Sequence, residues 1–217
     1  MKKEKDLGSL RKSYEKNTLD DDIKSINPFD LFQDWFTAAD KHTEIEEANA
    51  MTLVTLELDG FPRGRIVLLK QFSEAGFVFY TNYNSNKSRA IDAFDKVGLT
   101  FFWPEMERQV LIKGKAQKVA KETSDTYFYS RPKGSQIGAI VSPQSEPIEN
   151  RDFLENRLDK LEVLYEDKSP RRPDHWGGYL VVPNSIEFWQ GRPNRLHDRI
   201  EFILEQHKSW AAKRLAP

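Results

Sequence analysis

Cysteine is absent from this chain of 217 residues, which excludes disulfides, thiolate metal sites and cysteine nucleophiles. No run of apolar residues is long enough to span a bilayer, and the basic amino terminus lacks the apolar core of a signal peptide. Excess charge is absent too, because 33 basic and 34 acidic side chains give a formal net charge of −1. The chain therefore lacks the positive field typical of proteins that bind nucleic acid or anionic membranes. These absences predict a cytoplasmic protein with no nucleic-acid or membrane partner, which binds anions only at local sites.

Several common catalytic motifs are also missing. The sequence has no G-x-G-x-x-G after a strand, no P-loop, no H-E-x-x-H and no G-x-S-x-G. None of the four histidines stands at helical ligand spacing from another, so no metal site is predicted. The basic segment SPRRPDHW at residues 169–176 is interpreted as a solvated surface connection, because the near-neutral charge balance argues against a nucleic-acid patch.

The apolar content that is present suits one globular domain, with 38% hydrophobic and 12% aromatic residues. Residues 1–26 are highly charged and are predicted to form a flexible arm, so the domain is assigned to residues 27–217. This domain begins with NPFDLFQDWFTAADKH, in which Asn27 can cap a helix, Pro28 suits the first helical position, and aromatic residues recur at helical spacing. The segment therefore predicts a helix that packs on the core.

From Met51 onward the pattern becomes that of β-strands. MTLVTLELDGFPRGRIVLLK contains two apolar, β-branched runs around Asp59-Gly60, which predicts a hairpin. Further strands are predicted at residues 76–81, 97–103, 108–120, 176–182, 185–190 and 199–204. Helices are predicted at about 87–95, 121–130 and 149–166, with a shorter one after Gly134. Because the strands follow one another without a regular βαβ alternation, the sequence predicts a mainly β, α+β fold: an antiparallel barrel with peripheral helices.

Basic side chains gather at the predicted strand ends and turns. Arg65 and Lys70 bracket RIVLLK, where alternation directs them to opposite sides of one strand. Lys87 stands at the start of a predicted helix, where free backbone N–H groups favour an anion. Arg131 and Ser135 stand in SRPKGSQIGA, a turn that leads into another predicted helix. Near the carboxyl end, EFWQGRPNRLHDR adds three arginines and a histidine beside a tryptophan.

Each of these cations alone is more often a surface charge than a ligand. Together they supply groups for two separate phosphate sites, because arginine forks and lysine ammonium groups are the usual phosphate partners in proteins. Two anion sites beside several tryptophans indicate a phosphorylated aromatic cofactor and a phosphorylated aromatic substrate.

The sequence resembles the pyridoxine (pyridoxamine) 5′-phosphate oxidases, FMN enzymes of the split-barrel flavoprotein class. EFWQGRPNRLHDR fits the signature of that family, which is Glu-aromatic-Trp, a short variable loop, and then Arg-Leu-His-Asp-Arg. The resemblance runs from about Asn27 to the end and, more weakly, includes the arm. Supporting matches in chain order are RIVLLK, FYTN, ERQV, SRPKGSQIGA, SPQS, WGGY and the terminal RLAP. The resemblance implies a split antiparallel β-barrel that binds FMN and forms a homodimer with FMN at the subunit interface.

The resemblance also implies roles for individual residues. Arg195 and His197 would lie over the pyridine ring of the substrate as the catalytic pair, with Arg11 and Tyr14 closing over it as a lid. Further substrate contacts, mainly to the phosphate, are implied for Lys70, Tyr127, Arg131 and Ser135. The implied FMN-binding residues are Arg65, Ile66, Val67, Leu68, Leu69, Lys70, Tyr80, Thr81, Lys87, Gln109, Gln144, Ser145, Trp189 and Arg199.

The implied reaction is oxidation at C4′ of pyridoxine or pyridoxamine 5′-phosphate to pyridoxal 5′-phosphate. A hydride leaves C4′ for flavin N5, O2 then reoxidises the flavin with release of H2O2, and the amine substrate also yields ammonia. The flavin carries the hard chemistry, while the protein supplies alignment and electrostatics. In this scheme Arg199 or Gln109 acts near the pyrimidine edge of the flavin, and Arg195 and His197 orient the substrate and handle its proton.

One position departs from the family pattern. Relatives commonly carry Arg-Lys in the loop after the YTN strand, whereas this chain has Asn86-Lys87. One cation for the flavin phosphate is therefore missing, unless Arg192 or another nearby cation replaces it.

Two alternative functions stay open. One is a sister split-barrel oxidase that uses FMN on another ring substrate, for example one with a carboxylate in place of the phosphate; the other is a non-catalytic protein that binds flavin, pyridoxal phosphate or nucleic acid.

Overall fold

The structure of the protein is a computed structural model, and it describes residues 5–217. The chain divides into two units, each assembled from separated stretches of sequence. Unit 1 contains the chain up to Ala48 together with Phe101–Leu111 and Ser185–Pro217. Unit 2 contains Asn49–Thr100 and Ile112–Asn184. No helix among the described residues has both the length and the apolar character needed to cross a membrane.

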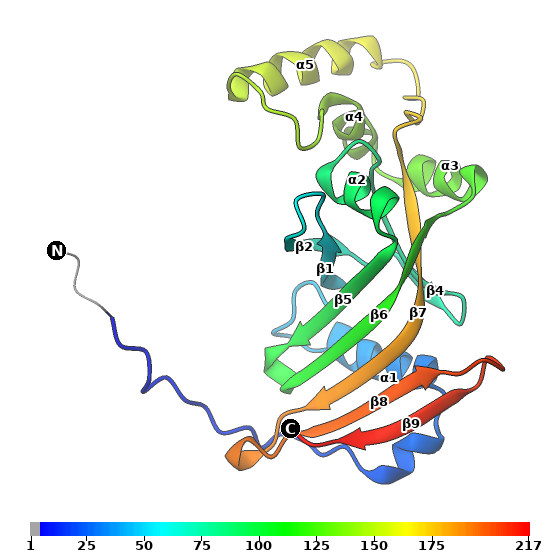
Figure 1. Ribbon diagram of the computed structural model, residues 1–217. Coiled ribbons are helices and arrows are strands. Elements are labelled where there is room, and N and C mark those ends of the chain that lie inside the picture. The colour runs from blue at the N-terminus through cyan, green and yellow to red at the C-terminus, as the bar shows by residue number, and fades with distance from the viewer. Residues whose placement is uncertain (1–4) are drawn as a thin grey trace. The chain divides into compact units, whose positions relative to one another are not determined.

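Unit 2 is built on an antiparallel sheet in which the strands follow the order β2-β1-β5-β6-β7-β4-β3 (Figure 1). Its strands are β1 (Ala50–Leu56), β2 (Pro62–Leu68), β3 (Gln71–Ser73), β4 (Gly76–Asn82) and parts of β5 (Lys96–Trp103), β6 (Arg108–Lys118) and β7 (Trp176–Gln190). β1 and β2 form the predicted hairpin, in register from Ala50 opposite Leu68 to Leu56 opposite Pro62. The turn contains Gly60 at φ +84°, a conformation that glycine adopts without steric strain. The hairpin leaves β2 as an edge strand of this sheet.

The helices of unit 2 lie between these strands in the sequence. They are α2 (Asn86–Ala93), α3 (Lys121–Ser130), α4 (Lys133–Val141) and α5 (Arg151–Leu164). α3 ends before Pro132, and Arg131 is extended at φ −75° and ψ 149°, because proline disfavours helical geometry in the residue before it. α5 is capped by Asn150, whose side chain accepts a hydrogen bond of 3.0 Å from the N–H of Phe153, and the helix packs against α4. The break at Pro132 places Arg131 in a tight turn between two helices.

Unit 1 combines the start and the end of the chain. It contains the 3-10 helix η1 (Asp21–Ser25), helix α1 (Pro28–Asp40), the end of β7, and the strands β8 (Asp198–Leu204) and β9 (Trp210–Leu215). β8 pairs antiparallel with β7 and with β9, and Figure 1 shows β8 and β9 side by side in orange and red. In this register Trp189 of β7 lies opposite Arg199 of β8. The signature segment at residues 187–199 therefore forms a strand end, a loop and the start of the next strand.

The core of unit 1 is aromatic. Asn27 caps α1 as predicted, since its Oδ1 accepts the N–H of Phe29 at 2.9 Å. On the buried face of α1, Phe32 packs edge-on against Phe101 with 5.2 Å between ring centroids. Trp35 packs in the same way against Phe188 of β7, also at 5.2 Å. Burial of each ring of this kind stabilises the fold by roughly 1.5–3 kcal/mol, so α1 is held to β7 largely by these contacts.

The sequence predicts the element types better than their ends. α3 has the predicted bounds, and the ends of α2 and α5 lie within about two residues of those predicted. The prediction of two strands at residues 176–182 and 185–190 is wrong, because β7 runs through Pro183 without a break. Pro183 stands between the residues that pair with β4 and those that pair with β8, so its missing N–H does not interrupt either ladder. The short strand β3 and the terminal strand β9 are not predicted.

The segment predicted as an arm is anchored at its carboxyl end. Leu19 is buried, with 1% of its surface exposed. Its N–H donates to Asp198 Oδ2 at 3.2 Å, and its carbonyl oxygen accepts a bond of 2.6 Å from Arg214 Nη2. η1 follows directly after this anchor. The predicted boundary at residue 26 thus lies beyond the point where the chain is already fixed, while the lid function of the arm stays a prediction.

Candidate functional site

A cavity of about 600 Å3 in unit 2 brings together most of the residues predicted to bind cofactor and substrate. The predicted residues that line it are Ile66, Val67, Leu68, Lys70, Tyr80, Thr81, Lys87, Tyr127, Arg131, Ser135 and Gln144. The lining residues that sequence reasoning missed are Asn82, Pro132, Gly138, Ala139, Ser142 and Trp176. None of the described lining residues is acidic, whereas two lysines and an arginine are among them. The cavity is therefore suited to an anionic ligand.

Lys87 lies in the first turn of α2 and reaches only neutral partners through the bonds described. Its Nζ donates to Ser85 Oγ at 2.9 Å, to Gln144 Oε1 at 2.9 Å and to Thr81 Oγ1 at 3.2 Å. Burial, followed by the nearby charge of Arg65, lowers the pKa of Lys87 from 10.5 to about 8. An ammonium group held in this way gains from an anion that replaces its lost hydration.

Arg131 is a second desolvated cation of the cavity. Its Nη1 is buried and has no hydrogen-bond partner among the described residues. The guanidinium lies 4.7 Å from the ring centroid of Trp176, a cation–π contact that orients it, and burial lowers its pKa. Because a buried donor without a partner is costly, this atom indicates an acceptor on a ligand. In the sequence, Trp176 belongs to the WGGY match with the family, but the resemblance assigns no role to this residue.

Aromatic rings form one wall of the cavity. Tyr80 and Tyr127 stack with 3.9 Å between centroids and an interplanar angle of 20°. Tyr80 also stacks on Trp176 at 5.6 Å and 13°, so β4, α3 and β7 each contribute a ring. Burial is the main cause that raises the pKa of Tyr80 and of Tyr127, so both phenols are neutral near pH 7. This wall offers flat apolar surface to a ring system.

In contrast to the apolar aromatic wall, strand β2 supplies a polar surface, which is the backbone edge of the strand. Ile66, Val67 and Leu68 line the cavity, and β2 is at the end of the strand order, so its outer N–H and C=O groups have no neighbouring strand within residues 5–217. Leu69 is buried, and its N–H and carbonyl oxygen bond to Asn49 instead. A heterocycle that carries both donors and acceptors can pair with an edge of this kind.

The side chain of Arg65 does not lie where the prediction places it. It is not among the lining residues of the cavity, because its guanidinium turns to the hairpin and bonds Glu57 Oε1 at 2.6 Å and Thr55 Oγ1 at 2.6 Å. The prediction that Arg65 and Lys70 bracket one strand is also wrong, since β2 ends at Leu68. Arg65 affects the site through its charge, which contributes to the lowered pKa of Lys87.

Ser145 lies beside the cavity and not on its lining. Its backbone is left-handed at φ +74°, and its Oγ accepts the N–H of Asn86 at 3.2 Å. Asn86 also accepts a bond of 2.5 Å from Arg89 Nη2 through its Oδ1. A cation therefore lies next to the position at which relatives carry their extra arginine, and it comes from α2 itself.

The remaining predicted residues belong to unit 1: Arg11, Tyr14, Gln109, Trp189, Arg195, His197 and Arg199. Three of them form an aromatic group. Trp189 and His197 are 4.6 Å apart by ring centroid, and Tyr14 lies 5.9 Å from Trp189 and 5.8 Å from His197. Gln109 is half-buried in β6. The structure thus brings the arm residue Tyr14 to the signature loop, as the lid hypothesis requires.

The loop after β7 fixes the tautomer of His197. Its Nδ1 accepts the N–H of Arg192 at 3.1 Å, so the neutral ring carries its proton on Nε2. Burial, followed by the charge of Arg195, lowers the pKa of His197. Asn194 and Arg195 are both left-handed, at φ +57° and φ +61°, which turns the chain sharply before the histidine.

A second cavity of about 540 Å3 lies between the arm and this loop in unit 1. Its lining consists of Leu10, Arg11, Lys12, Ser13, Tyr14, Arg192, Asn194, Arg195 and His197. Four of these side chains are cationic and none is acidic, so this cavity also suits an anion. The predicted catalytic pair, Arg195 and His197, lies on its wall.

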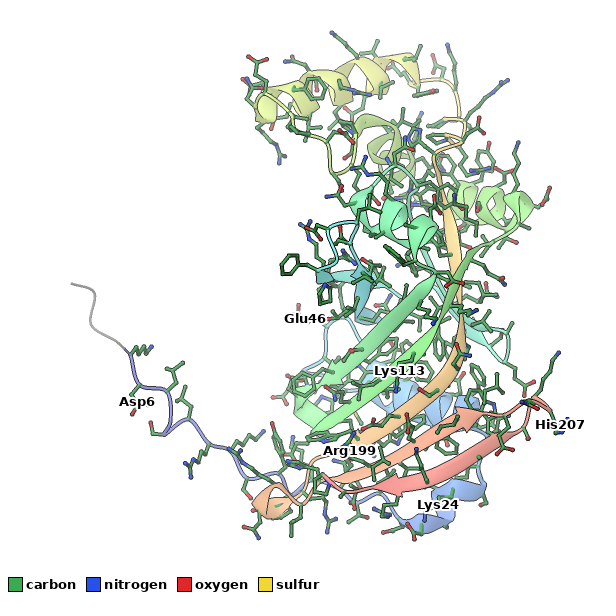
Figure 2. All side chains as sticks on the ribbon, in the orientation of Figure 1. Asp6, Lys24, Glu46, Lys113, Arg199 and His207 are labelled. Atoms are coloured by element: carbon green, nitrogen blue, oxygen red, sulfur yellow. The ribbon has the colours of Figure 1, made fainter. Side chains whose placement is uncertain are left out.

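The two ends of the signature have structural roles. Arg199, visible near the start of β8 in Figure 2, is held by both carboxylate oxygens of Glu187 at 2.7 and 3.2 Å. Asp198 accepts a bond of 2.8 Å from Arg214 Nη1, and Arg214 in turn binds Asp21 at 2.7 Å. Ion pairs therefore account for Asp198 and Arg199 at the end of the signature, but not for His197, whose bond is to the backbone N–H of Arg192. A flavin contact of Arg199 would have to share the guanidinium with Glu187.

The basic loop at residues 169–176 is not simply solvated, which corrects the prediction. The side chain of Arg172 is 5% exposed, and its Nε binds Asp125 Oδ1 at 2.6 Å. Its Nη1 also donates to the carbonyl oxygen of Trp176 at 2.5 Å. The arginine thereby ties the loop to α3 and positions the start of β7.

No group of three or more potential metal-ligating side chains occurs in the described part of the chain.

These observations fit a phosphorylated flavin and a phosphorylated ring substrate. The cavity of unit 2 has a buried donor without a partner, a desolvated lysine, an exposed strand edge and an aromatic wall. Phosphate satisfies the first two features, and a flat heterocycle with donors and acceptors suits the other two.

Comparison with known proteins leads to the same family. Residues 38–165 match the sequence model described as pyridoxamine 5′-phosphate oxidase, and residues 176–217 match the pyridoxine 5′-phosphate oxidase C-terminal dimerisation region. The chain is 56% identical to the pyridoxine/pyridoxamine 5′-phosphate oxidase of Flavobacterium johnsoniae, over 97% of this chain and 99% of the relative. It is 53% identical to that of Flavobacterium psychrophilum, over 98% of this chain and 100% of the relative.

Solved structures confirm the split-barrel fold. The crystal structure of PhzG from Burkholderia lata, in complex with tetrahydrophenazine-1-carboxylic acid, matches with a TM-score of 0.85 and 25% identity, covering 93% of this chain and 98% of that one. A pyridoxamine 5′-phosphate oxidase-related FMN-binding protein from Nostoc punctiforme matches with a TM-score of 0.71 and 14% identity, covering 89% of this chain and 100% of that one. The fold, the family match and the full-length relatives agree, and the chain belongs to the pyridoxamine 5′-phosphate oxidase family.

Proposed function

We propose that this protein oxidises pyridoxine 5′-phosphate and pyridoxamine 5′-phosphate to pyridoxal 5′-phosphate, with FMN as cofactor and O2 reduced to H2O2. The observation that carries the proposal is the acid-free cavity of unit 2, in which Arg131 has a buried, unpaired Nη1 beside a stack of aromatic rings. The relatives at 47–56% identity bear the corresponding name over nearly their full length. FMN is the cofactor of the family, and the features of the cavity fit it.

The substrate phosphate is assigned to Arg131, Lys70 and Ser135, which line the same cavity. An arginine fork gives a phosphate two directed bonds, while a lysine adds charge. Fixing one end of the substrate holds its C4′ group in one place, and positioning of this kind can lower a barrier by ~7 kcal/mol or more. The role of these residues is therefore binding and alignment.

Flavin binding is assigned to the edge of β2, to the aromatic wall and to Lys87. The outward-facing backbone groups in the Ile66–Leu68 stretch of β2 are suited to the donors and acceptors of the ring. Lys87, with Thr81 and Gln144 around its Nζ, is suited to the flavin phosphate. When bound, FMN supplies the two-electron acceptor that converts a C4′ alcohol or amine into the aldehyde and passes the electrons on to O2.

His197 and Arg195 are assigned to the ring of the substrate. Because Nδ1 of His197 accepts a backbone bond, its Nε2–H can donate to the substrate, and the low pKa keeps the ring neutral. To take up the proton that a C4′ hydroxyl releases, the ring would have to adopt the other tautomer, in which Nε2 is unprotonated and Nδ1 gives up the bond from Arg192. Arg195 remains charged and provides a fixed donor beside it. Tyr14 and Arg11 of the arm would close this side of the site.

The active assembly is proposed to be a homodimer with FMN at the subunit interface. Residues 176–217 match a region named for dimerisation, and this supports the proposal. A second observation is that the β1–β2 hairpin carries exposed apolar side chains: Leu58 is 69% exposed, Phe61 72% and Ile66 64%. Apolar surface of this kind commonly marks a protein interface.

A sister oxidase with another ring substrate is the second candidate, because PhzG matches with a TM-score of 0.85. Its 25% identity is well below the 56% of the Flavobacterium johnsoniae relative, which favours the vitamin B6 phosphates. Substrate tests separate the two. A holoprotein that binds FMN but does not turn over pyridoxine 5′-phosphate would support the sister function.

The deciding experiment is the visible spectrum of the purified holoprotein before and after anaerobic addition of pyridoxine 5′-phosphate. We expect a yellow protein that bleaches, and that regains its colour with release of H2O2 when air is admitted. A colourless protein that also fails to bind added FMN would end the oxidase proposal. Binding of FMN and of substrate without bleaching would indicate a non-catalytic binding protein.

A further inference from the structure

Glu107 is a buried carboxylate with an unusual backbone. It stands between the short 3-10 helix η2 (Pro104–Met106) and β6, and 2% of its surface is exposed. Its backbone is left-handed, at φ 55° and ψ 37°. Glycine or asparagine adopts this conformation with less strain, so a glutamate here indicates that the side chain is used.

The carboxylate of Glu107 binds the backbone of the arm. Its Oε2 accepts the N–H of Glu15 at 2.8 Å and the N–H of Lys16 at 3.0 Å. Its Oε1 lies 3.7 Å from the ammonium of Lys12. Glu15 and Lys16 are 92 and 91 residues earlier in the sequence. The first two bonds do not depend on any side chain of the arm, because they use backbone donors.

The main chain of Glu107 binds the loop that leads to His197. Its carbonyl oxygen accepts the N–H of Gly191 at 2.7 Å and a bond of 3.2 Å from Gln190 Nε2. One residue therefore holds both the arm and the start of the signature loop, and all of these groups belong to unit 1.

The ring of Tyr14 is placed at this junction. A Cβ atom at Gly191 would lie 2.7 Å from Tyr14 Cγ, so the ring rests directly on the backbone of the glycine. From there Tyr14 reaches Trp189 at 5.9 Å and His197 at 5.8 Å. Residues 15 and 16, which Glu107 binds, follow Tyr14 immediately in the chain.

We infer that Glu107 is a positioning residue that docks the arm onto the signature loop and so sets Tyr14 against His197 and Trp189. Glu107 does not line either cavity described above, and it acts through Tyr14 and Gly191. The inference rests on the proposed function in one respect only, which is that His197 and Arg195, on the wall of the cavity between arm and loop, contact the ring of the substrate. Docking of the arm by itself is independent of any activity.

The first pair of variants changes the carboxylate. Glu107→Gly removes it and suits the left-handed backbone, so the fold is not strained by the substitution. Glu107→Gln is the matched control, because both arm N–H groups meet a single oxygen, which the amide oxygen can replace. The control loses only the contact with Lys12, whose side chain is 63% exposed.

The second pair changes the arm and leaves Glu107 intact. Glu15→Pro removes one of the two N–H donors, and Glu15→Ala removes the side chain while keeping that donor. Residue 15 is exposed, so neither variant disturbs the core. This pair keeps the inference testable even where Glu107→Gly fails to fold.

Two measurements on each holoenzyme separate docking from function. For docking, trypsin cleavage after Lys16 should be about tenfold faster in Glu107→Gly and Glu15→Pro, since a released arm opens more often, and unchanged in Glu107→Gln and Glu15→Ala. For function, KM for pyridoxine 5′-phosphate should rise about five- to tenfold in the first two variants alone, with kcat and the Kd of FMN changed less than about twofold.

Equal cleavage rates in Glu107→Gly and the unmodified protein would overturn the docking role. Faster cleavage with an unchanged KM would overturn the positioning role and leave the oxidase proposal untouched. An increase of KM in Glu107→Gln equal to that in Glu107→Gly would show that charge, and not the two backbone bonds, is what matters, which also contradicts the inference. The bleaching experiment tests the oxidase activity separately.

Discussion

FMN affinity should depend on the charge of Lys87. In the apoprotein the pKa of Lys87 is lowered from 10.5 to about 8, because burial disfavours the ammonium and Arg65 repels it. A phosphate monoester has its second pKa near about 6, so the flavin phosphate is dianionic above pH 7. The dianion binds the protonated lysine, and binding above pH 8 must therefore take up a proton.

The structure sets the size of this effect. If the lysine must be protonated for tight binding, Kd rises by up to tenfold for each pH unit above the apoprotein pKa. FMN binding is then about 30-fold weaker at pH 9.5 than at pH 7.

The lowered pKa of Lys87 also affects the stability of the folded apoprotein. The unfolded lysine has a pKa of about 10.4, so between about pH 8 and pH 10.4 the unfolded chain binds more protons than the folded apoprotein. The destabilisation from the buried ammonium is fully present below pH 8, and it is relieved by roughly 3 kcal/mol as pH rises through this window.

The assay is titration of apoprotein with FMN between pH 7 and pH 9.5, followed by quenching of flavin fluorescence, with two variants as controls. Lys87→Arg should keep the affinity and remove the pH dependence, because a guanidinium stays protonated throughout. Lys87→Met should also be independent of pH, and about tenfold or more weaker at pH 7, since a charge-assisted bond to phosphate is lost. A flat profile for the unmodified protein, or a slope that persists in Lys87→Arg, would refute the assignment of Lys87 to the flavin phosphate.

Three further predictions concern the two anion sites. Unphosphorylated pyridoxine should have a kcat/KM about 100-fold or more below that of its phosphate, because Arg131 would keep an unpaired buried donor; equal values would remove Arg131 from the site. His197→Asn and Arg195→Leu should each lower kcat/KM about tenfold or more in steady-state assays while FMN content is unchanged, whereas early loss of FMN or of Tm would indicate a structural role. Asn86→Arg should lower the Kd of FMN about threefold to tenfold at low salt, with a smaller gain at high salt. Arg89 already bonds to Asn86 at 2.5 Å, so an unchanged Kd at low salt would indicate that Arg89 already provides the second cation for the flavin phosphate.

The structure brings most of the predicted residues of unit 2 into one cavity because they occur in short blocks that are each one local element. RIVLLK becomes the end of β2 and the residues after it, and FYTN becomes the end of β4. Within such a block, strand or turn geometry fixes the direction of each side chain, so a match of residue types transfers the position as well. The blocks then meet because the sheet brings their ends together.

The choice of partner is what the sequence could not supply. Arg65 and Arg199 are predicted as flavin ligands, yet each is paired with a glutamate: Glu57 across the hairpin and Glu187 on the adjacent strand. Both acids are visible in the sequence, but only the register of the strands shows which arginine each one faces. Trp176 was missed for a related reason, since its contact with Arg131 joins segments that are far apart in the chain.

The division of the chain between the units has a consequence for its synthesis. Unit 1 needs both the residues up to Ala48 and those from Ser185 onward, so it cannot close until the residues from Ser185 onward have been synthesised. Until then α1 keeps the apolar face of Trp35 in water, because Phe188 has not yet been made. Pairings at such long range also fold slowly. The nascent chain is therefore open to aggregation through α1 during this interval, and a chaperone that shields this helix is expected to raise the yield of folded protein.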